Sequence, residues 1–127
     1  PPRSTLFPYT TLFRSSKGKL KAIELEWDPR VALGVVMAAG GYPNYYEKGY
    51  PIKGLPSESK TVKVFHAGTQ AEDDIITTNG GRVLCVTALG KNTTEAQLKA
   101  YNCIKQINWK NCFYRTDIGH RAIIRES

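Results

Sequence analysis

Short apolar runs alternate with polar, glycine-rich connections along the chain, a pattern that predicts several short strands. Residues 31–39 read VALGVVMAA and end at a pair of glycines. A run this short and this rich in β-branched residues favours a buried strand over a helix. Residues 40–56 are dense in Gly, Pro, Asn and Tyr, so we expect a long loop there.

Three more strands are expected in the middle of the chain. Residues 60–67 have a period-two pattern, which predicts a half-exposed strand. A short strand over residues 75–78 and a longer one over residues 82–89 flank Asn79-Gly80-Gly81. Because this tripeptide is a strong hairpin signal, we expect the two flanking strands to pair antiparallel.

One amphipathic helix follows. Asn92 and Glu95 have the spacing of a capping box, and a set of apolar residues recurs at helical spacing behind them: Ala96, Ala100, Cys103, Ile104 and Ile107. The pattern predicts a helix of about four turns. Residues 109–127 are expected to form a turn and a last strand.

These elements predict an α+β, β-rich fold: a small antiparallel β-barrel or curled sheet with one main helix. The expected core contains Val31, Val35, Val36, Phe65, Val83, Leu84, Val86 and Ile104. The length of 127 residues allows a single domain. A composition with 41% hydrophobic and 23% charged residues is ordinary for a globular protein, and it excludes a disordered tail or a collagen-like repeat.

The N-terminal stretch has a foreign character. Residues 5–15, TLFPYTTLFRS, match the in-frame translation of a common sequencing adapter, so we set residues 1–15 aside as a non-native segment. The alternative is a natural flexible arm. Residues 16–29 are expected to be the end of a helix or a connector, and residues 30–127 the domain proper.

The charge balance is basic. Lys and Arg number 18 against 11 Asp and Glu, and without the two arginines of residues 1–15 the balance is 16 minus 11, or +5. Such a charge suits an anionic small molecule or a nucleic-acid backbone about equally. The three cysteines form no CxxC pair, which indicates neither a disulfide framework nor a zinc site and fits a reducing cytosol. No stretch of 18 apolar residues occurs, so we expect no membrane span.

The strongest chemical signal is the glycine turn that opens on Arg82. Gly80 and Gly81 would let a ligand approach the backbone and its N–H groups, and a guanidinium suits phosphate oxygens. The alternative is a hairpin turn followed by a surface arginine. His66 to Thr69, HAGT, could present an imidazole and a hydroxyl, or could be structural. Asp73-Asp74 predicts no metal site, because neighbouring loop carboxylates point apart.

A tyrosine-rich loop is a further candidate. Tyr42, Tyr45, Tyr46 and Tyr50 lie close in the sequence to Lys48 and Lys53, which resembles the mixture of aromatic and basic residues in proteins that stack the bases of single strands. The same residues could equally line a loop packed against neighbouring protein. These residues and Arg82 support one alternative function, a free-standing basic β-barrel that binds single-stranded nucleic acid.

Several motifs, in order, resemble the C-terminal domain of the phosphoribosylamine–glycine ligases: EWDPRVALGVVMAAGGYP, GYPIKGLP, VFHAGT, TNGGRVLCVTALG, EAQLKAY and CFYRTDIGHRAI. The resemblance covers about residues 26–127. It implies the C-terminal domain of an ATP-grasp ligase, with residues 16–29 ending the ATP-grasp module. This cytoplasmic family joins glycine to 5-phosphoribosylamine in purine synthesis, at the expense of ATP and with Mg²⁺ or Mn²⁺.

The resemblance also implies a division of labour. The ATP and metal residues of the family lie upstream of this chain, so the chain alone would hold no catalytic residue, no metal and no ATP, and would be inactive. Its partners would be 5-phosphoribosylamine and the N-terminal and ATP-grasp domains, with no nucleic acid and no membrane. Arg82, with Gly80 and Gly81, would bind the substrate phosphate. The family often has a lysine after HAGT, where this chain has Gln70, a hydrogen-bond donor without charge.

Overall fold

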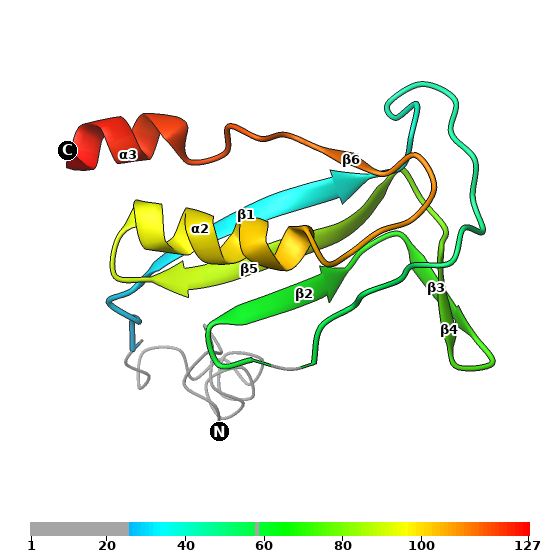
Figure 1. The fold of residues 1–127 in the computed structure, drawn as a ribbon, viewed down its shortest axis with the longest axis horizontal. Coiled ribbons are helices and arrows are strands. Elements are labelled where there is room, and N and C mark those ends of the chain that lie inside the picture. The colour runs from blue at the N-terminus through cyan, green and yellow to red at the C-terminus, as the bar shows by residue number, and fades with distance from the viewer. Residues whose placement is uncertain (1–25, 58) are drawn as a thin grey trace, which may run out of the picture.

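An antiparallel four-stranded sheet forms the body of the domain in the computed structural model, which describes residues 26–57 and 59–127 (Figure 1). The strand order is β2-β5-β1-β6, and the strands are β1 (Val31–Ala38), β2 (Val62–His66), β5 (Arg82–Gly90) and β6 (Phe113–Tyr114). The strands expected at residues 31–39, 60–67 and 82–89 are confirmed. Because β2 and β6 are free edges, the sheet is open, and no closed barrel forms among the described residues.

A second, two-stranded sheet holds β3 (Thr69–Glu72) and β4 (Ile75–Thr78). The expected pairing of residues 75–78 with 82–89 is therefore wrong. A tight two-residue hairpin needs positive φ at both loop residues, and Asp73 and Asp74 supply it with φ of 47° and 65°. Neither Gly80 nor Gly81 has a positive φ, so the hairpin forms one strand earlier than expected.

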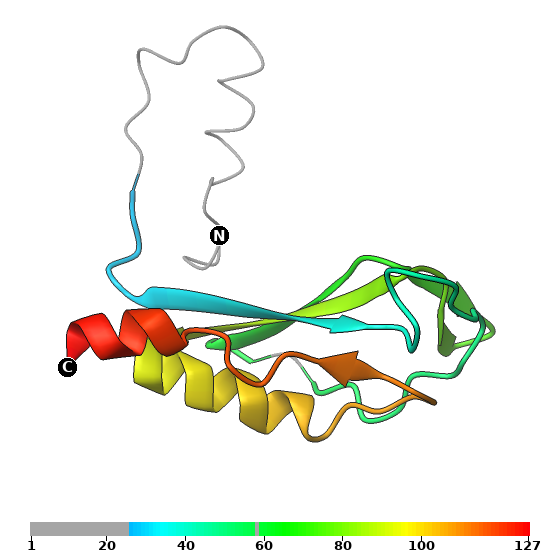
Figure 2. The same cartoon turned by 90° about the horizontal axis from the view of Figure 1, so that it is seen from above.

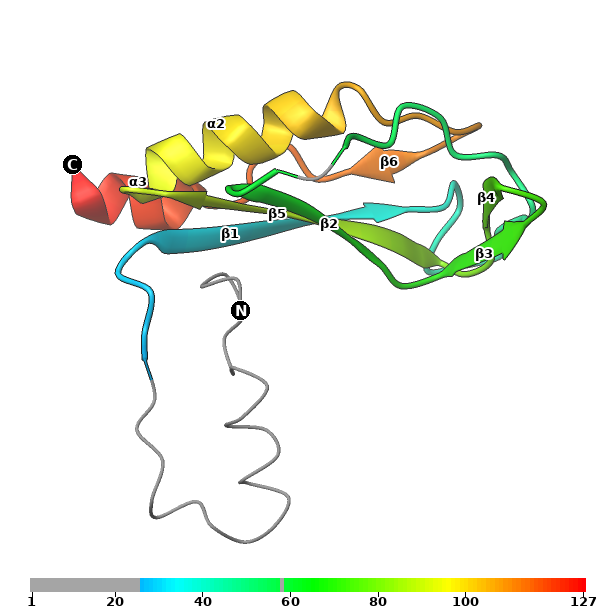
Figure 3. The same cartoon turned by 90° about the horizontal axis from the view of Figure 1, so that it is seen from below.

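Alternation along most of β1 and β5 divides the main sheet into two faces. Leu33, Val35 and Met37 pair with Ala88, Val86 and Leu84, and all six side chains are buried. The helix α2 (Thr93–Ile104) packs over this face, mainly on β5 and β1 (Figures 2 and 3). The core thus lies between one helix and one face of the sheet.

Two residues of the expected core lie on the opposite face. Val36 and Phe65 are 44% and 48% exposed. Side chains along a strand point alternately to its two faces, and these two point away from α2. Val31 is only partly buried at the margin of the core. The other expected core residues, Val35, Val83, Leu84, Val86 and Ile104, are confirmed as buried.

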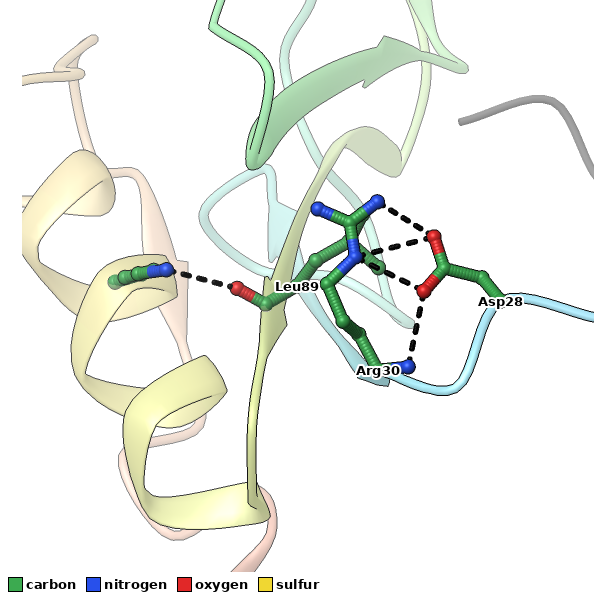
Figure 4. Close-up of polar contacts among 4 residues, drawn as sticks. Asp28, Arg30 and Leu89 are labelled. Atoms are coloured by element: carbon green, nitrogen blue, oxygen red, sulfur yellow. Dashed lines mark hydrogen bonds and ion pairs between the residues drawn. The ribbon is translucent and has the colours of Figure 1, made fainter. Parts of the chain in front are cut away.

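The expected start of α2 is confirmed. The Asn92 side chain accepts a hydrogen bond from the Glu95 N–H at 2.8 Å, and the Glu95 carboxylate accepts one from the Lys91 N–H at 2.6 Å. The helix has 12 residues, just over three turns rather than four. The Lys99 ammonium donates a hydrogen bond to the Leu89 carbonyl at 3.2 Å and so ties α2 to β5 (Figure 4).

The C-terminal segment differs from its prediction. A last strand is present as the two-residue β6, but a helix, α3 (His120–Glu126), follows it. The Glu126 carboxylate accepts hydrogen bonds from the Thr93 N–H at 2.9 Å and from the Thr93 hydroxyl at 2.5 Å. Seven residues are too few for a helix to be stable alone, so tertiary contacts of this kind stabilise α3.

The two sheets meet at a close backbone contact between Gly68 and Gly80. A Cβ atom on Gly68 would lie 2.8 Å from the Gly80 Cα and 2.7 Å from the Arg82 carbonyl oxygen. The Asn79 N–H donates to the Gly68 carbonyl at 2.7 Å, and the Ala67 and Gly68 N–H groups both donate to the Val83 carbonyl. Only glycine permits backbones to approach this closely.

An ion pair lies at the entrance to β1. The Asp28 carboxylate faces the Arg30 guanidinium, with Oδ2 2.5 Å from Nη2, and Oδ1 also accepts from the Arg30 N–H at 2.9 Å (Figure 4). These hydrogen bonds from Arg30 lower the pKa of Asp28 from 3.8 to about 2. The adapter-like residues 1–15 and most of the expected connector lie outside the described residues, and residues 26–30 contain no regular element.

The Asp28 pKa gives a first test. Arg30→Ala removes the hydrogen bonds that favour the carboxylate, so the pKa of Asp28 should rise toward 3.8. Because the folded pKa is the lower one, the pair stabilises the fold above the ordinary pKa and ceases to do so as the pH falls toward 2. Carboxyl-carbon NMR titration of both proteins measures the shift, and an unchanged pKa would exclude Arg30 as its cause.

The glycine contact gives a second test. Gly68→Ala should lower the free energy of unfolding by about 1–3 kcal/mol, because the added methyl group meets backbone that cannot move aside. Ala67→Ser is the matched control, because it adds one atom to an exposed side chain directly beside Gly68. Urea denaturation compares the two, and equal losses of stability would show that the Gly68 contact is not tight.

Candidate functional site

The candidate site lies where β2, β4 and β5 meet, and it joins the two glycine-containing motifs. HAGT runs from the last residue of β2 to the first residue of β3, and Asn79-Gly80-Gly81 leads from β4 into β5. The Gly68–Gly80 contact places these segments directly against each other. The His66 Nδ1 and the Thr69 hydroxyl lie 3.1 Å apart within this unit. The structure therefore brings together two motifs that the sequence could only treat separately.

A β-bulge near the start of β5 affects how Arg82 is presented. The register passes from Met37↔Leu84 to Ala38↔Arg82, which leaves Val83 as an extra residue. Strict alternation would place Arg82 on the same buried face as Leu84. Because the bulge breaks the alternation, Val83 and Leu84 are both buried while Arg82 is exposed.

The Arg82 guanidinium is free to meet a ligand. It forms no ion pair within residues 26–57 and 59–127, and the side chain is exposed. Over the same residues, neither the Gly80 N–H nor the Gly81 N–H donates a hydrogen bond. An exposed guanidinium that follows the unused N–H of the half-buried Gly80 is suited to an anion with several oxygen atoms, whereas Gly81 is itself buried.

Tyrosine rings of the loop over residues 40–50 pack against the glycine turn, a contact that the sequence did not predict. A Cβ atom on Gly81 would overlap the ring of Tyr42 and lie 3.1 Å from Cε1 of Tyr46. The two rings lie 6.2 Å apart in a tilted arrangement, and each is partly buried. These two rings pack against the domain itself, in agreement with the packed-loop interpretation, whereas Tyr45 is 84% exposed.

Gln70 lies on β3, opposite Thr77. Its amide Nε2 donates to the Glu72 carboxylate at 2.8 Å. An anion at this place would have to compete with Glu72 for the amide. Gln70 is therefore the weakest of the four expected site residues.

The other chemistry expected of the chain is limited. No group of three or more His, Cys, Asp or Glu residues that could hold a metal ion occurs among the residues that the structure describes. All three cysteines are free, and burial raises the pKa of the Cys103 thiol. None of the helices described is long and apolar enough to span a membrane.

A groove of about 390 Å³ lies elsewhere, between the loop at Tyr50 and the turn at Trp109. Lys53 and Lys110 line it, and the Lys110 ammonium lies 5.5 Å from the centroid of the Tyr50 ring. The groove contains none of the four expected site residues. We place the candidate site at Arg82 because an exposed charge directly follows the glycine turn there.

Known proteins resemble the chain over most of its length. Residues 32–121 match the family model described as phosphoribosylglycinamide synthetase, C domain. The phosphoribosylamine–glycine ligase of Vibrio cholerae is 58% identical over 110 residues, which are 86% of this chain and 26% of the relative. That of Allochromatium vinosum is 59% identical over 110 residues, again 86% of this chain and 26% of the relative.

A solved structure agrees with the sequence comparison. The crystal structure of the phosphoribosylamine–glycine ligase of Thermotoga maritima superposes with a TM-score of 0.70 and 34% identity, and covers 85% of this chain and 27% of that one. The chain thus spans about a quarter of the length of these relatives. None of these comparisons supports the nucleic-acid alternative. The chain belongs to the phosphoribosylglycinamide synthetase family and carries its C domain.

Proposed function

We propose that this chain forms the phosphate-binding wall of the phosphoribosylamine site in a phosphoribosylamine–glycine ligase. The reaction of the whole enzyme would join glycine to 5-phosphoribosylamine, with ATP converted to ADP and phosphate. The part of the chain described here would bind the 5-phosphate and hold the sugar so that its amine faces the activated glycine. The proposal rests on family membership and on the geometry at Arg82.

One observation carries the proposal: the exposed Arg82 directly follows a glycine turn whose two N–H groups donate no hydrogen bond within the described part of the chain, although Gly81 is buried. A phosphate there would accept charge-assisted hydrogen bonds from Arg82 and backbone hydrogen bonds from Gly80 and Gly81. A hydrogen bond to a charged group contributes about 1.5–3 kcal/mol. Arg82 alone would thus account for about one to two decades of affinity.

Gln70 has a lesser role in this proposal. Its amide is engaged by Glu72 in the free chain, so a phosphate would gain this donor only by displacing a carboxylate. The position lacks the positive charge of the lysine common in the family, and its contribution would be that of a neutral hydrogen bond.

ATP chemistry belongs to another part of the enzyme. The described residues bring together no donor set for a divalent cation, so they do not fit the metal that the family requires. We assign ATP, the metal and the activation of glycine to the preceding part of a full-length ligase. This chain alone would then be inactive, and residues 16–29 would connect the two parts.

The proposal predicts a selective kinetic defect. In a chimera, residues 26–127 replace the corresponding region of the Vibrio cholerae relative. Arg82→Ala in this chimera should raise the KM for phosphoribosylamine about ten- to a hundredfold, because a charge-assisted contact to the phosphate is lost. The KM for ATP should stay the same, and Arg82→Lys should recover part of the loss because the charge remains.

Arg121→Ala is the control, since it removes an exposed arginine from α3 and should leave both constants unchanged. Steady-state kinetics with each substrate varied in turn measures the effect. If Arg82→Ala and the unsubstituted chimera have the same KM for phosphoribosylamine, Arg82 does not bind the phosphate.

A further inference from the structure

The face of the main sheet opposite α2 has an apolar row that crosses three strands. Val36 on β1 pairs with Cys85 on β5, which in turn pairs with Phe65 on β2. Paired residues on neighbouring strands project to the same side of a sheet, so the three side chains form one continuous band. Val36 and Phe65 are 44% and 48% exposed.

The next row on this side, Gly34, Thr87 and Lys63, is flatter. Gly34 adds no side chain, and the Lys63 ammonium lies 5.3 Å from the centroid of the Phe65 ring. We call these six residues the open face. Lys63 provides its one formal charge. A matching surface would therefore be apolar with a carboxylate opposite Lys63.

Residues 26–30 lead into β1 from the side of the open face. Figures 2 and 3 both show this segment turning away from the sheet on the side opposite α2. Trp27 in this segment is 69% exposed, and the Asp28–Arg30 pair lies at its junction with β1. Among the described residues, the chain thus enters β1 from the side of the sheet opposite α2.

The relatives contain further polypeptide that could cover this face, because the chain covers only 26% of the Vibrio cholerae ligase. Exposed apolar side chains that form a continuous band are more typical of an interface than of a surface that faces water. We propose that the open face is the docking surface for the preceding part of the ligase chain, through an apolar patch with a carboxylate that meets Lys63. This inference rests on the proposed function, since it takes the chain to be one domain of that enzyme.

Thiol labelling tests the docking surface. Val36→Cys is prepared both in the 127-residue chain and in the chimera with the Vibrio cholerae relative, and maleimide modification is followed by peptide mass spectrometry. We expect labelling of residue 36 at least tenfold slower in the chimera, because docking covers it. The native Cys85 gives the same comparison without any substitution in the open face.

Leu98→Cys is the matched control, because Leu98 on α2 is 62% exposed and lies on the helix that covers the other face. Its labelling rate should be the same in both proteins. Equal rates for residue 36 in the two proteins would overturn the proposal. Slow labelling of the 127-residue chain that becomes fast on dilution would also overturn it, and would assign the open face to a second copy.

The outcome is independent of the phosphate site. Protection of residue 36 together with an unchanged KM in Arg82→Ala would keep the docking surface and refute the role of Arg82. Fast labelling in a chimera whose KM responds to Arg82→Ala would refute the docking surface alone.

Discussion

The contact between Gly68 and Gly80 is the constraint on which the rest of the site depends. It holds the turn after β2 against the turn before β5, with no room for a side chain at Gly68. The Asn79–Gly68 hydrogen bond fixes the same junction. As a result the β3–β4 hairpin is joined to the main sheet beside Arg82, and two motifs separated by about a dozen residues act as one unit.

The bulge near the start of β5 complements this contact. Side chains along a strand point alternately to its two faces, and this alternation alone would have turned Arg82 toward the core. One extra residue, Val83, fills the interior and leaves the guanidinium in solvent. A small packing irregularity thus separates the structural part of β5 from the part available to a ligand.

Much of the fold could be predicted from the sequence because local patterns determine it. The β-branched run of β1, the alternation of β2 and the Asn92–Glu95 cap each act over a few residues.

The sequence misplaces the hairpin because Asn79-Gly80-Gly81 is the stronger local signal. In the structure, this tripeptide instead takes part in the close glycine contact that joins the two sheets. The helix α3 escaped prediction because its contact with Thr93 is 33 residues away in the chain. Apolar character predicts a core position for Val36 and Phe65, but it does not say which face of a sheet is covered. At the candidate site the sequence indicated Arg82 and its glycines, but neither the bulge nor the tyrosines over Gly81.

The most direct test of the central claim is a crystal structure of the chimera with the reaction product, glycinamide ribonucleotide, bound. The account predicts that the 5-phosphate lies against the Arg82 guanidinium and accepts hydrogen bonds from the Gly80 and Gly81 N–H groups. A phosphate bound at another place, with Arg82 still in solvent, would contradict it.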